Sequence, residues 1–127
     1  MHIEHGEVTI EIIDNIILVR SVGAFNEYGA KKYTEGIKAA INGLSSKKFS
    51  ILTNNLKFLG ATPEAYQVLE AYNLWLNTQN LIAKAMVITS STTLDVINMF
   101  SPSRSLQQNE NFDNEAEALA WLKSLNF

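Results

Sequence analysis

The chain has 127 residues, no cysteine and a formal net charge of −3, with 46% hydrophobic and 18% charged residues. This composition predicts a single globular domain over residues 1–127, and it excludes disulfide bonds and thiolate chemistry. The 10 Lys and Arg residues are scattered, so we expect no nucleic-acid partner. The sequence contains no apolar run of about 18 residues, so no transmembrane segment is predicted. The acidic start MHIEHGEVTI is no signal peptide, which leaves a cytoplasmic protein as the expectation.

The first elements predicted are two strands joined by a tight turn. The run Val8–Ile12 alternates apolar and polar residues, which indicates a half-buried strand. Asp14–Asn15 separates it from Ile16–Val19, so the two runs read as a hairpin. The second run is apolar on both faces and is therefore predicted to be the more interior strand.

A helix is predicted to follow the hairpin, with Asn26 as its N-cap. Its apolar residues recur at helical spacing and form one stripe: Ala30, Tyr33, Ile37, Ala40, Ile41 and Leu44. Gly29 and Gly36 lie seven positions apart and share a face of this helix. Either the close approach of another backbone or chance explains them.

The middle of the chain predicts a short strand, Phe49–Thr53, then a polar loop and a second helix. Thr62, Pro63 and Glu64 are typical of a helix start, with a hydroxyl cap, a proline at the first position and an acid in the first turn. The buried stripe predicted for this helix is Ala65, Val68, Leu69, Tyr72 and Leu76.

The last part of the chain predicts two more strand and helix pairs. Ala85–Ile88 is a continuous apolar run typical of a strand covered on both faces. Thr92 or Thr93 is expected to cap a short helix that ends near Phe100, and Arg104–Gln108 is predicted as a weak, polar strand at a sheet edge.

Asp113 or Asn114 is expected to open the final helix. Its core-facing residues are Ala118, Leu119, Leu122 and Leu125, with Trp121 beside them. The predicted order is therefore β-β-α-β-α-β-α-β-α. It implies an α/β fold with a mixed, mostly parallel sheet and helices packed against it.

Three local sequences carry a resemblance to a known family. They are Gly6–Ile10 at the start, Phe100–Ser101–Pro102, and Phe112 followed by the stretch Glu117–Leu122. With the element order, they make the whole chain resemble the STAS superfamily and in particular its SpoIIAA-like branch. The resemblance implies a bacterial-type, non-enzymatic regulatory module that binds protein partners and needs no cofactor.

The chain departs from this family at its best-known site. Anti-sigma-factor antagonists of the superfamily carry an Asp-Ser-Ser/Thr-Gly-like motif after the third strand, and its serine is phosphorylated. The resemblance places Gly60, Ala61 and Thr62 over that motif, so Ala61 occupies the phosphoacceptor position without a hydroxyl. The Thr62 hydroxyl is interpreted as the helix cap. We therefore expect the phosphorylation switch to be absent.

Catalytic and metal-binding chemistry has little support in the sequence. His2 and His5 lie in an extended segment, where their rings point to opposite faces, so no metal site is expected. The loop Thr89–Thr93 lacks the glycines and the lysine of a phosphate loop, and its hydroxyls are interpreted as helix caps. No carboxylates are seen to converge as an acid–base pair. A hydrolase or transferase that uses loop hydroxyls is a third hypothesis, which lacks a base.

The remaining candidate is an apolar interaction or ligand patch. Its predicted residues exceed what one core-facing helix stripe requires: Phe58, Tyr66, Tyr72, Leu74, Trp75, Met99 and Phe100. Ordinary single-residue exposure with generous core burial explains them equally well. The leading hypothesis is a regulatory module with a protein partner or self-association. The alternative is a domain that binds an apolar small molecule, a lipid or a membrane surface.

Overall fold

The computed structural model describes residues 3–125, and in this part of the chain the predicted element order is confirmed. The elements are β1 (Glu7–Ile13), β2 (Ile16–Phe25), α1 (Glu27–Gly43), β3 (Phe49–Ala61), α2 (Pro63–Leu76), β4 (Leu81–Val87), α3 (Ser91–Phe100), the 3₁₀ helix η1 (Pro102–Leu106), β5 (Asn109–Phe112) and α4 (Glu115–Lys123). His2, one of the two histidines for which no metal site is predicted, lies outside the described residues.

The strands form one sheet in the order β1-β2-β3-β4-β5. β1 and β2 pair antiparallel, whereas β2–β3, β3–β4 and β4–β5 are parallel, as the sequence predicts. The hairpin turn places Asp14 at φ 55°, a left-handed conformation that Asp tolerates well. β2 has a neighbour on each side, and Ile16–Val19 within it is fully buried, as expected for an interior strand.

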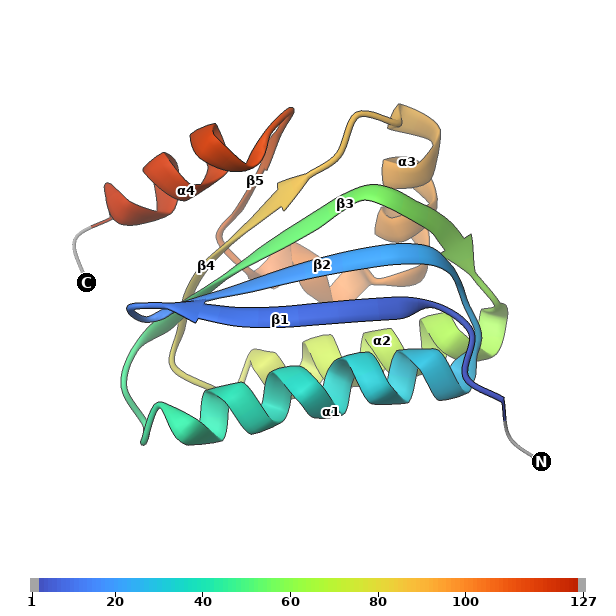
Figure 1. The fold of residues 1–127 in the computed structure, drawn as a ribbon, viewed down its shortest axis with the longest axis horizontal. Helices are drawn as coiled ribbons and strands as arrows, with labels where there is room; N and C mark the ends of the chain where they lie inside the picture. Colours follow the sequence, from blue (N-terminus) through green and yellow to red (C-terminus); the bar gives the residue numbers. More distant parts are fainter. Residues whose placement is uncertain (1–2, 126–127) are drawn as a thin grey trace.

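Helices cover both faces of the sheet (Figure 1). α1 and α2 lie on one face, where their side chains pack with Ile17, Ile51 and other strand residues. α4 lies on the opposite face, and its Leu122 packs against Leu18 and Leu52. α3 and η1 pack beside α2. The described residues therefore form a core on each face of the sheet, and a third cluster joins Tyr66, Met86, Ile88 and Ile97.

Close packing explains Gly29 and Gly36 in α1. A Cβ at Gly29 would collide with the backbone carbonyl oxygen of His5, and a Cβ at Gly36 would come within 2.7 Å of Ile10 Cδ1. The same junction is fixed by Asn26, whose Oδ1 accepts hydrogen bonds from the backbone N–H groups of Gly29 and His5. The atom that a Cβ would meet belongs to the backbone at Gly29 but to a side chain at Gly36. Of the two explanations offered by the sequence, close approach of another backbone therefore applies only to Gly29.

β3 is much longer than predicted, and the polar loop expected after Thr53 is wrong. The backbone of residues 54–61 continues to pair with β2, as far as the match between Phe25 and Ala61. Irregularities in the register let β3 accommodate extra residues in this stretch. Gly60 has φ 110°, which favours glycine even though space for a Cβ is free. Tertiary pairing thus overrides the weak local preference of a polar sequence.

The predicted strand Arg104–Gln108 is also wrong. Pro102 begins the 3₁₀ helix there, and β5 starts only at Asn109. Asn109 Nδ2 donates to the carbonyl oxygens of Arg104 and Gln107, which holds this turn against the strand. β5 does lie at the sheet edge, as expected.

The helix caps differ from the prediction at one place. α3 is capped by Ser90, whose Oγ accepts from Thr93 N at 3.1 Å, so neither Thr92 nor Thr93 is the cap. Of the two candidates for α4, Asn114 is the cap, since its Oδ1 accepts from Glu117 N.

Candidate functional site

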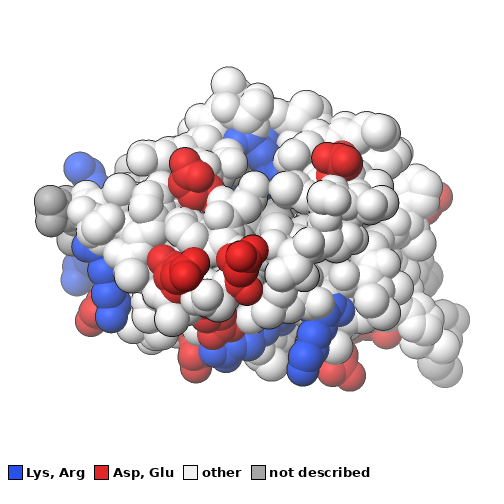
Figure 2. All heavy atoms as spheres, turned by 90° about the horizontal axis from the view of Figure 1, so that it is seen from above, with Lys and Arg blue, Asp and Glu red and all other residues white. Residues whose placement is uncertain are grey.

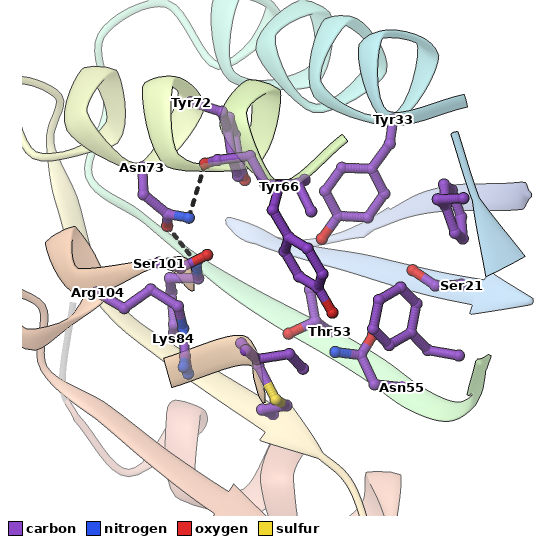
Figure 3. A pocket seen from close by; sticks show the side chains of 15 residues that line it. Ser21, Tyr33, Thr53, Asn55, Tyr66, Tyr72, Asn73, Lys84, Ser101 and Arg104 are labelled. Atoms are coloured by element: carbon purple, nitrogen blue, oxygen red, sulfur yellow. Dashed lines mark hydrogen bonds between the residues drawn. The ribbon is translucent and has the colours of Figure 1, made fainter. Parts of the chain in front are cut away.

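A small pocket lies between the sheet and the helices α1, α2 and α3 (Figure 3). It is near the carboxyl ends of β2, β3 and β4. In open α/β sheets this is the usual position for a binding site. Its volume is about 60 Å³, well above the roughly 10–15 Å³ that a water needs. The lining residues are Ser21, Phe25, Tyr33, Thr53, Asn55, Phe58, Tyr66, Leu69, Tyr72, Asn73, Lys84, Met86, Ile97, Ser101 and Arg104.

Lys84 lies at one end of this pocket, on an otherwise apolar β4. Its Nζ donates to Asn73 Oδ1 at 3.0 Å and lies 5.7 Å from the ring centre of Tyr72. Asn73 Oδ1 also accepts from Gln107 Nε2, and Asn73 Nδ2 donates to the carbonyl oxygen of Leu69. Burial lowers the pKa of Lys84 to about 7, and the positive charge of Arg104 acts in the same direction.

Arg104 brings a second buried cation to the same end of the pocket. Its Nη1 donates to Asn98 Oδ1 at 2.6 Å, whereas its Nε has no hydrogen-bond partner among residues 3–125. Burial lowers the pKa of this guanidinium, which still remains protonated at neutral pH. Within the described residues, neither Arg104 nor Lys84 forms a salt bridge with a carboxylate.

Tyrosines form much of the remaining wall. The hydroxyl groups of Tyr66 and Tyr72 are buried without a hydrogen-bond partner in the part of the chain that the structure describes. Tyr33 packs edge-on against Tyr72, with ring centres 6.1 Å apart, and Phe100 stacks on Tyr66 at 5.0 Å. Burial raises the pKa of the Tyr33, Tyr66 and Tyr72 phenols, so they are neutral hydrogen-bond donors at physiological pH.

The pocket combines charged donors with neutral polar groups. The donors are the ammonium of Lys84 and the guanidinium of Arg104, and the neutral groups are phenol hydroxyls, the hydroxyls of Ser21, Thr53 and Ser101, and the amides of Asn55 and Asn73. No carboxylate lines it, so a carboxylate acid–base pair is not assembled there. Among residues 3–125, no cluster of His, Cys, Asp and Glu is suited to hold a metal ion.

The residues at the predicted phosphoacceptor position lie where β3 meets α2. Ala61 ends β3, and Thr62 is the N-cap of α2, with its Oγ1 accepting a hydrogen bond from Ala65 N at 3.1 Å. Gly60 precedes them near the end of β3, the strand that pairs with β2. They adjoin the pocket without lining it.

The predicted apolar patch is divided by the fold. Phe58, Tyr66 and Tyr72 line the pocket. Trp75 is half-buried on α2 and packs against the core between the helices and the sheet, and Lys38 Nζ lies 5.0 Å from its ring centre.

The other three residues of that patch are on the surface. Leu74 is 54% exposed on the outer side of α2, and Met99 and Phe100 are 72% and 44% exposed at the end of α3. Leu59 at the end of β3, which the sequence did not single out, is 77% exposed.

The sequence reasoning missed Lys84, Asn73 and Arg104. A signal was present for Lys84, since it is the single charge in the strand sequence LIAKAMV. Arg104 falls in the segment predicted as a weak edge strand, and Asn73 lies between Tyr72 and Leu74, which were both singled out for their apolar character. No comparable local signal marks either of them.

The outer surface shows no continuous basic region on the side that carries α3 and α4 (Figure 2). Acidic side chains are scattered over this face between uncharged ones. None of the helices in the described part of the chain is long and apolar enough to cross a membrane.

Comparison with known proteins identifies the fold. No family model and no curated protein sequence matches the chain. A solved structure of an uncharacterized DUF3478 protein with a SpoIIAA-like fold, from Shewanella loihica PV-4, is similar with a TM-score of 0.69 and 16% identity, covering 96% of this chain and 97% of that one.

Two anti-sigma factor antagonists are similar at 13% identity. The protein from Mycobacterium paratuberculosis has a TM-score of 0.67, with 94% of this chain and 95% of that one covered. Unphosphorylated SpoIIAA has a TM-score of 0.66, with 95% and 100% covered. The chain therefore has the SpoIIAA-like α/β fold that its sequence resemblance predicts.

Proposed function

We propose that this protein is a non-enzymatic regulatory module that binds a protein partner at the end where β3, α2 and α3 meet. The observation that carries the proposal is the exposure of Leu59 at the end of β3 and of Met99 and Phe100 at the end of α3, at 77%, 72% and 44%. Large exposed apolar side chains are typical of a protein-interaction surface. The likeness to anti-sigma factor antagonists supports a binding role through the fold alone.

This module works without a phosphorylation switch at the position of Ala61. The methyl side chain of Ala61 offers no acceptor oxygen, and the Thr62 hydroxyl serves the backbone of α2. Intact-mass analysis of the protein from its native cell tests this part. An unmodified mass is expected, and a phosphate on Thr62 would refute it.

The partner surface is tested with single charges. Leu59→Asp and Met99→Asp are expected to abolish capture of a defined partner from native lysate, because each places a charge in the apolar contact. Ile12→Asp is the matched control. Ile12 is 48% exposed on β1 and pairs with Ile17 at the opposite end of the sheet, so capture is retained. Equal capture by all three variants would contradict the proposal.

A second candidate function, binding of a small molecule in the pocket, is favoured by a separate observation. The pocket is lined largely by aromatic and aliphatic side chains, yet two phenol hydroxyls and Arg104 Nε within it have no hydrogen-bond partner among residues 3–125. Buried polar groups are rarely left unsatisfied, so a ligand that meets them would stabilise the folded state. The volume of about 60 Å³ is far below the roughly 300–1,000 Å³ of sites for drug-sized ligands, which favours a small occupant over a whole acyl chain.

A further inference from the structure

We propose that the pocket binds the carboxylate of a small organic acid through Lys84, Arg104 and Tyr72, with the apolar tail of the acid against the aromatic wall. This inference rests on the second candidate function above and adds the chemical class of its ligand.

The first argument is the uncompensated charge at the polar end of the pocket. Lys84 and Arg104 are each 6% exposed, and neither has an acidic partner among residues 3–125. Removing an ion from water without a counter-ion is costly, and two like charges near one another add to that cost. One bound carboxylate would compensate both.

The second argument is that the donors converge. Lys84 reaches the pocket from β4, Arg104 from η1 and Tyr72 from α2, and Figure 3 shows the Lys84 and Arg104 side chains close together beside Asn73 and Ser101. Arg104 Nε and the Tyr72 hydroxyl are both without a partner in the described chain. A carboxylate is an acceptor-only group with about four lone-pair sites, so it can satisfy several donors at once.

The rest of the wall selects an organic acid over an inorganic anion. Phe25, Phe58, Leu69, Met86 and Ile97 supply most of the surface beyond the cations, where the small polar side chains of Ser21, Thr53 and Asn55 also line the pocket. Phosphate would leave that surface in contact with a strongly hydrated dianion. A carboxylate head followed by a short apolar tail matches both ends of the pocket, and the volume of about 60 Å³ limits how much of the tail is enclosed.

Binding is expected to weaken above neutral pH, because burial lowers the pKa of Lys84 and the free site loses that charge in mild base. The groups that face Lys84 do not reverse this trend. Arg104 on η1 keeps its charge, and the phenols Tyr33 on α1 and Tyr72 on α2 stay neutral with raised pKa values. Glu70 on α2 is engaged by Ser103, through both its N–H and its hydroxyl.

The test is titration of the 127-residue chain with hexanoate, hexanamide and inorganic phosphate, with binding measured by calorimetry and by amide chemical shifts. At pH 6 we expect saturable binding of hexanoate, with shift changes at the pocket residues, and hexanamide at least about 10-fold weaker. Lys84→Met is expected to weaken the binding of hexanoate by about 10-fold to 100-fold. The milder Tyr72→Phe is expected to weaken it by about 3-fold to 10-fold. Lys48→Met changes an exposed lysine and should leave the affinity for hexanoate unchanged.

The possible failures are distinguishable. Equal binding of hexanoate and hexanamide would overturn the carboxylate assignment while small-molecule binding stands. Phosphate that displaces hexanoate from the pocket would overturn the organic-acid class. The absence of any shift in the pocket with every probe would overturn both the carboxylate inference and the small-molecule function. Hexanoate binding that is insensitive to Lys84→Met and to Tyr72→Phe would overturn the assigned residues.

Discussion

The buried lysine makes a specific prediction for stability as a function of pH. Its pKa falls from the ordinary 10.5 to about 7 in the folded protein, so between these values the unfolded chain binds a proton that the folded chain has released. Stability therefore rises with pH in this window, by at most about 1.4 kcal/mol per pH unit. Integrated from pH 7 to pH 9, the gain from Lys84 is about 2 kcal/mol. Below pH 6 the contribution is flat, because the amine is protonated in both states.

The window from pH 7 to pH 9 isolates this lysine. Tyr33, Tyr66 and Tyr72 have folded pKa values raised above their ordinary 10, so the stability they confer is intact below pH 10 and is lost only above it. Glu115 has a lowered pKa, and its stabilising effect is lost only in acid.

Urea unfolding followed by circular dichroism at pH 6, 7, 8 and 9, without added organic acid, measures the profile. We expect the wild-type free energy of unfolding to rise by about 2 kcal/mol from pH 7 to pH 9. In Lys84→Met the rise shrinks to less than about 0.5 kcal/mol, because the titrating group is gone. Lys48→Met keeps the wild-type slope, since its side chain is exposed in the folded state.

Two results would refute this reasoning. A flat wild-type profile between pH 7 and pH 9 would mean that Lys84 is fully charged and well solvated in the folded protein. A slope that survives in Lys84→Met would assign the titration to another group. Either result would also remove the electrostatic basis for the carboxylate site.

The remaining predictions concern the cap, an ion pair and self-association. Thr62→Ala removes the hydroxyl that accepts from Ala65 N and should cost about 1 kcal/mol of unfolding free energy, whereas Thr62→Ser is near neutral in the same urea assay. Glu115→Ala breaks a paired contact with Arg20, at 2.8 Å and 2.9 Å; because both side chains are partly exposed, we expect a loss of about 1 kcal/mol, and a larger loss would show stronger coupling. Leu74→Glu is expected to give monomers in sedimentation if the outer face of α2 mediates self-association; unchanged assembly would exclude that face.

The local signals in the sequence were reliable where a few neighbouring residues decide the conformation. Thr62 and Asn114 cap their helices as predicted, because a cap is a contact between residues three positions apart. The parallel sheet with one antiparallel hairpin follows from the order of strands and helices together with the short turn at Asp14. The resemblance to the SpoIIAA-like branch rested on similar short stretches and is confirmed at the level of the fold.

The errors arose where distant residues decide. Asn54, Asn55 and Lys57 made residues 54–61 read as a loop, but pairing with β2 keeps these residues in β3. The segment around Arg104 alternates weakly like a strand, yet Pro102 and the contacts of Asn109 fold it into η1. In both cases the energy of tertiary pairing and side-chain contacts exceeds the small local preference.

The sequence by itself determined the fold class, the succession of elements and the absence of a hydroxyl at Ala61, since these depend on residue identity and on short periodic patterns. Only the tertiary structure decided which polar groups meet. Lys84, Arg104 and Tyr72 come from three different elements, and their burial in one small pocket leaves two cations without a carboxylate partner, and Arg104 Nε and the Tyr72 hydroxyl without a hydrogen-bond partner, among residues 3–125. Burial and convergence are properties of the packed sheet and helices, and no local pattern in the chain encodes them.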